Sequence, residues 1–209
     1  MQSRRICLLA LVVVVVGSTV QGAEAWRPEP LPRDEEFREA LAAGPESVRE
    51  GAGVYVLTSR GYELARESAN GFHCLIERSQ SGTFEPQCLD AEGSATILES
   101  VLLKARLRMG GANEAEVDRV VGLAWARGEL TAPSRPGINY MLSEHNRVPI
   151  DAETVIPYQP HVMFYVPYLS NIDLGAEPMG SAPVFVVNEG QPNAYVIVPV
   201  SVGEDHGGR

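Results

Sequence analysis

The order of secondary-structure signals along the 209-residue chain predicts an α+β fold, in which a helix pair packs on one face of a mostly antiparallel sheet of five to seven strands. Short β-branched and aromatic runs come first, two segments with apolar residues at helical spacing follow, and further strand-like runs complete the pattern. Because strands and helices do not alternate, a parallel sheet of the Rossmann type is not expected. Residues 26–202 are long enough to form this fold as a single domain.

The first part of this domain combines one short helix with three strands. Residues 34–42 carry acidic side chains in their first turn and apolar residues on one side, which predicts a helix. Strands are expected at residues 54–58, 62–67 and 72–77. The dipeptide Asn70-Gly71 is typical of a tight hairpin, so we expect a meander with one face in the core and the other partly exposed to water.

The middle of the chain predicts the helix pair. Residues 82–91 are interpreted as a loop, and Ser94 as the N-cap of the first helix. The apolar stripe of that helix consists of Ile97, Leu98, Val101, Leu102 and Ala105. Asn113 and Glu116, spaced as in a capping box, predict the start of the second helix.

The last third of the chain returns to strands. They are expected at residues 138–142, 161–166, 184–187 and 194–198, the last two forming a hairpin. Residues 147–159 are interpreted as irregular and residues 171–183 as a long loop, because both contain prolines and few β-branched runs. Residues 203–209 are polar and glycine-rich, which predicts a disordered tail.

The N-terminus has the three regions of a secretory signal peptide. Two arginines lie in residues 1–5, an unbroken apolar run covers residues 6–16, and an Ala-Glu-Ala motif stands at residues 23–25. The apolar run is shorter than the roughly 20 residues that a membrane-spanning helix needs. We therefore expect a signal peptide at residues 1–25, cleavage near Ala25, export to the periplasm or beyond, and no membrane span in the mature chain. An uncleaved anchor is the alternative.

The mature chain is strongly acidic, which limits its partners. Residues 26–209 contain 15 Lys and Arg against 26 Asp and Glu. A protein with this net charge repels phosphate backbones and anionic lipid, so binding to nucleic acid is not expected. The expected partner is a small molecule or another protein.

Two cysteines remain after cleavage, Cys74 and Cys88. An even number of cysteines in an exported chain predicts a disulfide, which for a loop of this length stabilises the fold by about 3 kcal/mol. A redox pair or two metal ligands are the alternatives, but the cysteines lack the C-x-x-C spacing of such sites. We expect the bond to hold the loop after the third strand onto the sheet.

The stretch PHVMFYVPY, residues 160–168, contains the only histidine in an otherwise apolar strand signal. On a strand, Val162, Phe164 and Val166 would share the face expected to lie in the core, and His161, Met163 and Tyr165 would share the other. Such a second face most often packs under helices, but a histidine, a thioether and a phenol in a row also suit a pocket. The predicted ligand-binding residues are therefore His161, Met163, Tyr165 and Tyr168.

These observations favour a non-catalytic domain that binds a small ligand or a partner, and they indicate no cofactor. The chain lacks the G-x-S-x-G, H-E-x-x-H, C-x-x-C and Walker motifs. Aromatic side chains that could line a cleft are Tyr140, Tyr158, Phe164, Tyr165, Tyr168 and Tyr195. The alternative is a metal-dependent hydrolase, with converging ligands His73, His145 and His161 and a carboxylate from Glu144 or Asp173.

Four segments spread over most of the mature chain are NGFHCLIERS, CLDAEGSATIL, RPGINYMLS and PHVMFYVPYLSN. In these segments the chain resembles exported bacterial proteins of unknown function. The resemblance agrees with export. It implies no activity and carries no site residues over to this chain.

Overall fold

The computed structural model describes residues 25–175 and 184–200. The predicted signal peptide, apart from Ala25, and the predicted tail lie outside the described residues. Within these two ranges, no helix is both long enough and apolar enough to cross a membrane.

The described part of the chain forms five α-helices and a 3-10 helix. They are α1 (Arg33–Leu41), α2 (Glu46–Arg49), α3 (Ala91–Ala95), α4 (Ile97–Met109), α5 (Glu114–Ala126) and η1 (Ile172–Leu174). Its strands are β1 (Gly53–Thr58), β2 (Gly61–Arg66), β3 (His73–Glu77), β4 (Glu85–Leu89), β5 (Ile138–Met141), β6 (Arg147–Pro149), β7 (Val155–Pro157), β8 (His161–Tyr165), β9 (Phe185–Val187) and β10 (Tyr195–Pro199). The α+β class is confirmed.

The main sheet has eight strands in the order β2-β1-β3-β4-β5-β8-β10-β9, and β6 pairs with β7 separately. It is larger than the predicted five to seven strands, and it is mixed rather than mostly antiparallel because β1 and β3 run parallel. The expected hairpin at Asn70-Gly71 is therefore wrong. Asn70 donates to the carbonyl of Val48, and the amide of Ala69 donates to Gly51, so the chain is anchored to the α2 region and passes the end of β1.

Strand β4 occupies the segment predicted as a loop, which is one reason that the sheet is larger than expected. Pro86 lies within it and has Ile76 of β3 opposite. On its other side, β4 meets β5 only through Cys88 and Leu89. A strand tolerates a proline where it has one neighbour, because no ladder hydrogen bond is lost there.

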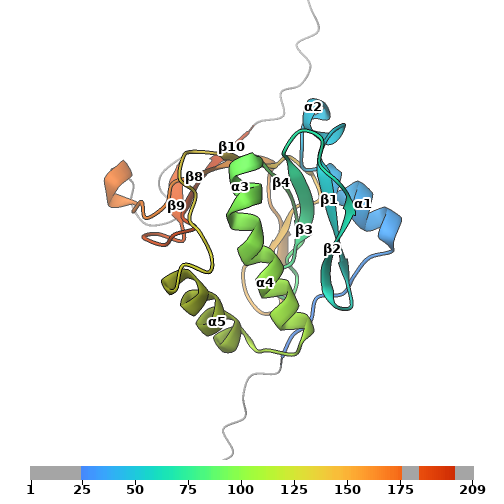
Figure 1. Cartoon of the computed structure of the whole chain (residues 1–209), viewed down its shortest axis with the longest axis horizontal. Coiled ribbons are helices and arrows are strands. Elements are labelled where there is room, and N and C mark those ends of the chain that lie inside the picture. The colour runs from blue at the N-terminus through green and yellow to red at the C-terminus, as the bar shows by residue number, and fades with distance from the viewer. Residues whose placement is uncertain (1–24, 176–183, 201–209) are drawn as a thin grey trace, which may run out of the picture.

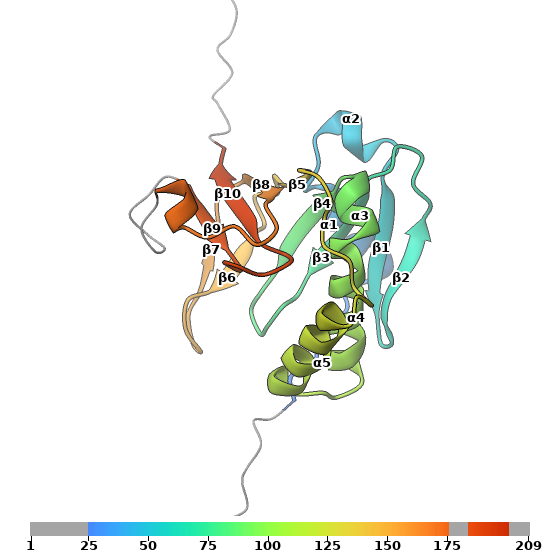
Figure 2. The same ribbon diagram turned by 60° about the vertical axis from the view of Figure 1, so that its left-hand side comes forward.

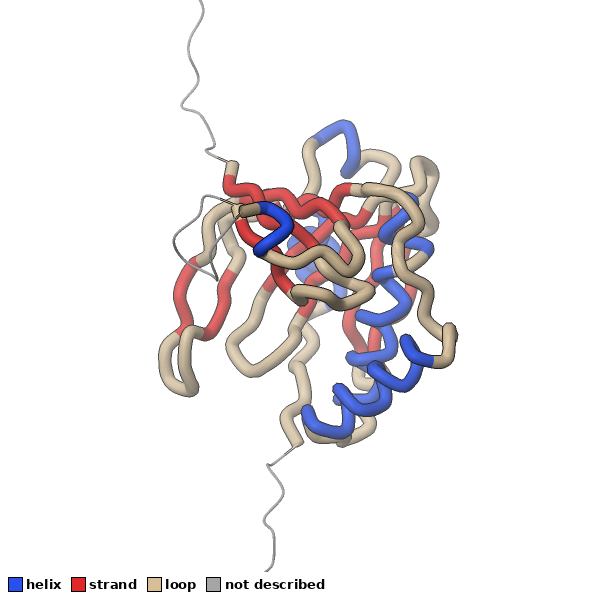
Figure 3. The backbone as a smooth tube through the Cα atoms, turned by 90° about the vertical axis from the view of Figure 1, so that its left-hand side faces the viewer, coloured by secondary structure: helices blue, strands red, loops and turns tan. Residues whose placement is uncertain are grey.

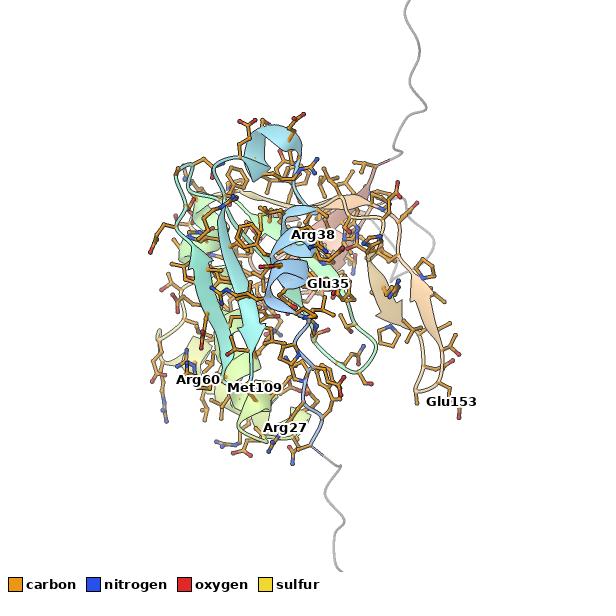
Figure 4. The ribbon with its side chains drawn as sticks, turned by 90° about the vertical axis from the view of Figure 1, so that its right-hand side faces the viewer. Arg27, Glu35, Arg38, Arg60, Met109 and Glu153 are labelled. Carbon is orange, nitrogen blue, oxygen red and sulfur yellow. A yellow bond between two sulfur atoms is a disulfide. The ribbon has the colours of Figure 1, made fainter. Side chains whose placement is uncertain are left out.

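Helices cover both faces of the sheet at the β1–β3–β4 end. Helix α1 packs on one face (Figure 4), and α3 and α4 pack on the other, with α5 against α4 (Figures 1 and 2). The core under α1 contains Ala40, Ala43, Val54, Val56, Cys74, Ile76 and Cys88. The core under α4 contains Leu75, Leu89, Leu98, Val101 and Tyr165. The sequence predicted a helix pair on one face, and α1 covers the other face as well. The strands expected to form the meander keep partly exposed side chains, such as Glu63 and Leu64 of β2.

Local sequence signals explain several boundaries. Asn113 caps α5 as predicted, with its side chain accepting from the amide of Glu116 at 3.0 Å. Ser94, predicted as the N-cap of the first helix of the pair, lies instead within the short helix α3, which Asp90 caps by accepting from the amide of Gly93 at 2.9 Å. Helix α4 begins at Ile97, with Thr96 at its N-cap position. Residues 147–159, predicted as irregular, contain the β6–β7 hairpin, which stands apart from the main sheet (Figure 3).

The disulfide between Cys74 and Cys88 is present, with the Cα atoms 4.0 Å apart. The two residues lie directly opposite one another in the antiparallel β3–β4 pair. The bond therefore joins neighbouring strands within the core under α1, and does not fasten a loop to the sheet as the sequence suggested.

Candidate binding cavity

The helix-covered face of the sheet continues beyond α4, and there it forms a cavity. Register places Leu89, Asn139, Met163, Ile197 and Phe185 opposite one another across β4, β5, β8, β10 and β9. Helix α4 lies over the β1–β3 end of this face, and β8, β9 and β10 extend past it (Figure 2). Two adjoining cavities of about 190 and 230 Å³ border these strands. We call them together the sheet cavity, because both are lined by Glu77, Glu85, Gln87, Met163 and Tyr195.

The floor of the sheet cavity is apolar. Met141, Met163 and Ile197 form a buried cluster, and Phe185, Val187 and Tyr195 pack against it. These side chains come from successive strands at alternate positions, so a single face of the sheet supplies the whole floor. Methionines adapt their shape to what they contact, which suits a surface that receives a ligand.

One wall of the sheet cavity is polar. Glu77 and Glu85 stand directly opposite one another on β3 and β4. Gln87 donates from Nε2 to Glu77 at 2.7 Å, and Asn139 donates from Nδ2 to Oε1 of Gln87 at 2.5 Å. Because a carboxylate only accepts, this chain fixes the orientation of both amides. Its last atom, Oδ1 of Asn139, has no hydrogen-bond partner in the described part of the chain.

Electrostatics in this wall favour protonation. Burial, and then the charge of Glu77, raise the pKa of Glu85 to about 8. Burial, followed by the charges of Glu77, Glu85 and Tyr158, also raises the pKa of Tyr195. The carboxyl group of Glu85, which lines the cavity, is thus mostly protonated at neutral pH.

His161 lies at the edge of the floor and is buried. Its Nδ1 is 2.9 Å from the carbonyl of Gln159, and its ring meets that of Tyr158 edge-on at 4.9 Å. Burial lowers the pKa of His161, with the carbonyl of Gln159 opposing the shift in part. Since a carbonyl oxygen only accepts, Nδ1 carries the proton of the neutral ring and Nε2 is an acceptor.

The structure brings three of the four predicted ligand residues to the sheet cavity. His161 and Met163 line one part of it, and Met163 and Tyr165 line the other. Tyr168 is 62% exposed and lies elsewhere, beside Pro133 and Pro136. The prediction that Val162 and Phe164 face the core is wrong, because Phe164 is 40% exposed whereas His161, Met163 and Tyr165 are buried. The face of β8 that carries His161, Met163 and Tyr165 is the buried one, because it is turned toward α4 and the sheet cavity.

The three histidines of the metal alternative lie apart in the fold. His73 packs against Tyr55, with ring centroids 5.7 Å apart. Nδ1 of His145 bonds to Glu39 at 2.6 Å, next to α1, and only His161 lines the sheet cavity. The carboxylate of Asp173 accepts from Ser170. In residues 25–175 and 184–200, no three His, Cys, Asp or Glu side chains form a group that could hold a metal ion.

Sequence reasoning missed Glu85, Gln87 and Asn139 as members of the site. Glu85 and Gln87 alternate at the spacing of a strand, but Pro86 between them led to the interpretation of a loop. Of the six aromatic residues expected in a cleft, those lining the sheet cavity are Tyr158, Tyr165 and Tyr195. Tyr140 packs instead in the core under α1.

The arrangement combines an apolar floor, an acidic wall and hydrogen-bond acceptors, which is suited to holding a small molecule in a fixed orientation. Comparison with known proteins gives no match to this chain, whether with protein-family models, with curated proteins or with solved structures.

Proposed function

We propose that this protein is exported and that its mature domain, residues 26–202, binds a small ligand in the sheet cavity without converting it. The observation that carries the proposal is the polar wall formed by Glu77, Glu85, Gln87 and Asn139, set against an apolar floor. Binding sites commonly have this composition, in which a few polar groups orient a ligand and apolar contacts supply affinity.

Two independent features support export. The N-terminal pattern at residues 1–25 is that of a signal peptide. The Cys74–Cys88 disulfide is typical of proteins from an oxidising compartment such as the periplasm or the exterior.

Hydrogen bonding within the cavity favours binding over catalysis. The hydroxyl of Ser100, which lines the cavity, donates to the carbonyl of Ile97 in its own helix. The carboxylate of Glu77 accepts from Gln87, an amide that cannot act as a nucleophile or exchange a proton. A serine nucleophile requires an adjacent base that activates its hydroxyl, and the bond of Ser100 to a backbone carbonyl does not provide one.

A ligand screen by thermal unfolding tests the proposal. A ligand that binds only the folded state stabilises it by RT ln(1 + [L]/Kd), or about 2.7 kcal/mol at 100 times Kd. Val187→Trp would place an indole in the cavity from β9 and is expected to abolish the shift. Phe164→Trp, on the exposed face of β8, is the control and is expected to retain it. A flat response of the natural protein to cationic, neutral and anionic compounds would contradict the proposal.

A further inference from the structure

We propose that the ligand of the sheet cavity is a small organic cation with a primary ammonium group, which Glu77 and Glu85 hold while its hydrocarbon part lies on the floor of Met141, Met163 and Ile197. This inference rests on the proposed function and names the class of ligand. It follows from three observations on the polar wall and from the chemistry of the floor.

The first observation is that two carboxyl groups meet without a cation. Residues directly opposite in an antiparallel pair are close neighbours, so ionising both Glu77 and Glu85 would place two like charges side by side, which contributes to the raised pKa of Glu85. Among residues 25–175 and 184–200, neither carboxylate lies within ion-pair distance of a basic side chain. A ligand that carries a positive charge would remove this repulsion.

The second observation is that the nearest arginines are engaged elsewhere. Arg78 follows Glu77 along the chain but turns to the α1 face, where it binds Glu36 through two hydrogen bonds of 2.7 and 2.8 Å. Arg108 of α4 likewise binds Glu114 at 2.8 and 2.9 Å. Lys104 of α4 also lines the cavity, but among the described residues it forms no ion pair with Glu77 or Glu85, so a ligand can supply the charge that neutralises the wall.

The third observation is the unpartnered oxygen of Asn139, a residue that is 1% exposed and lines the same cavity. A buried acceptor without a donor costs roughly 1–3 kcal/mol. Gln87 and Asn139 each use one amide N–H within the wall, and Oδ1 of Asn139 remains as an acceptor without a donor. An ammonium group has three N–H donors and no acceptor, so it can donate to this oxygen and to the carboxyl groups of Glu77 and Glu85.

The floor and rim suit the rest of such a ligand. Met163 and Ile197 offer apolar contacts, and the rings of Tyr158, Phe185 and Tyr195 line the same space. Aromatic faces attract ammonium groups, and more strongly where water is excluded. A hydrocarbon chain or ring of modest size can lie there while its charge reaches the acidic wall.

Binding of an ammonium group is expected to release a proton from Glu85. Because the pKa of this carboxyl is about 8 without a ligand, most of it is protonated at pH 7. A bound cation favours the ionised form, so the carboxylic acid gives its proton to the solvent as the carboxylate–ammonium pair forms. The other titratable or charged groups that line the sheet cavity are Glu77, Lys104, Tyr158, His161, Tyr165 and Tyr195, and Arg108 interacts with Glu77 through its charge.

Isothermal titration calorimetry at pH 7 with three probes of one skeleton provides the test: 2-phenylethylamine, 2-phenylethanol and 3-phenylpropanoate. The amine is expected to bind at least about tenfold more tightly than the alcohol, since its hydrogen bonds are charge-assisted, and the anion more weakly still. In buffers of different ionisation enthalpy, the amine alone is expected to release a proton.

Variants of the same side-chain shape test whether the two carboxyl groups of the polar wall cause the preference for the amine. Glu85→Gln and Glu77→Gln are each expected to weaken amine binding about tenfold while leaving the affinity for the alcohol within a factor of about two. Glu85→Gln is also expected to abolish proton release. Glu63→Gln removes a carboxylate of β2 that lies outside the cavity, and this control is expected to retain amine binding.

Two results overturn the inference and leave the proposed function standing: the alcohol or the anion binding as tightly as the amine, or Ca²⁺ or Zn²⁺ stabilising the protein where the amine does not. If none of the probes and none of the compounds in the thermal screen binds, both proposals fall together.

Discussion

Glu36 is a fully buried carboxyl group on the α1 side of the sheet, Glu85 is a partly buried one at the sheet cavity on the other side, and their surroundings differ. Glu36, under the β1–β3 end, is 0% exposed and is held by Arg78 through two hydrogen bonds, with the amides of Leu31 and Leu57 also donating to it. Glu85 of β4, in the polar wall of the sheet cavity, stands opposite Glu77 and has no basic partner among the described residues.

The difference separates a part of the fold built for stability from a part suited to binding. At the β1–β3–β4 end, helices cover both faces of the sheet, a disulfide joins neighbouring strands and the buried charges are paired. At the sheet cavity, the floor is apolar, but the wall on β3, β4 and β5 keeps one unsatisfied acceptor, Oδ1 of Asn139. Buried polar groups left without partners are costly, and functional sites are where proteins tolerate that cost.

Breaking the pair at the stable end is expected to have the largest effect. Arg78→Met leaves the Glu36 carboxylate buried and unpaired, and is predicted to lower the free energy of unfolding by about 3–5 kcal/mol. Urea denaturation measures it. The double variant Glu36→Leu with Arg78→Met removes both charges and is expected to recover most of the loss. Equal losses in the single and double variants would show that the charge pair is not the cause.

Removing the disulfide comes next. Replacing Cys74 and Cys88 together by alanine frees a loop with a sequence separation of 14, and is predicted to cost about 3 kcal/mol without abolishing the fold. Scanning calorimetry of the oxidised protein and the variant measures the shift. Mass spectrometry of alkylated, unreduced protein is the companion test, and labelling of both thiols would show that the bond does not form.

The raised pKa of Glu85 in the polar wall is expected to make the free energy of unfolding depend on pH, with a smaller effect than the two changes above. Folded Glu85, with a pKa of about 8, keeps a proton that the unfolded chain loses above its ordinary pKa of 4.5. Its contribution to stability is therefore complete below about pH 4.5 and is lost as the pH rises to about 8. Relative to Glu85→Gln, the natural protein is predicted to lose about 2 kcal/mol between pH 6 and pH 8. A constant difference between the two proteins would contradict the raised pKa.

A surface ion pair gives the smallest predicted effect and sharpens the contrast with Glu36. Arg60 and Glu63 are 2.7 Å apart, as close as Arg78 and Glu36, but their side chains are 82% and 40% exposed. Arg60→Ala is expected to change the free energy of unfolding by less than about 0.5 kcal/mol, because water screens exposed pairs. A loss of stability comparable to that of Arg78→Met would mean that burial does not determine how much these ion pairs contribute to the free energy of unfolding.

Sequence reasoning located most elements of the fold, because local signals determine them. The cap at Asn113 and the β-branched run that includes Val54 and Val56 lie where they were predicted. Pairing was harder to predict. The turn signal at Asn70-Gly71 suggested β2 beside β3, whereas contacts of Asn70 with α2 place β1 between them. Such contacts between distant segments leave no periodic signal in the sequence.

The candidate site was only half predictable for a similar reason. His161, Met163 and Tyr165 share a strand face, so their alternation alone grouped them. Glu77 and Glu85 meet only through the register of β3 with β4, and the proline inside β4 concealed that strand. The polar wall of the cavity depends on which strands pair and in which register, and local patterns in the sequence do not reveal either.

A titration of the side-chain carboxyl carbons by NMR, with and without 2-phenylethylamine, tests the central claim most directly. The claim is that the polar wall of the sheet cavity holds a partly buried carboxyl group that binds a cationic ligand. It predicts that Glu85 titrates near pH 8 in the free protein, and that saturating amine lowers its pKa to below about 6 while Glu63, at the surface, does not respond. A Glu85 carboxyl that titrates near 4.5 in the free protein, or whose pKa the amine leaves unchanged, would contradict the account.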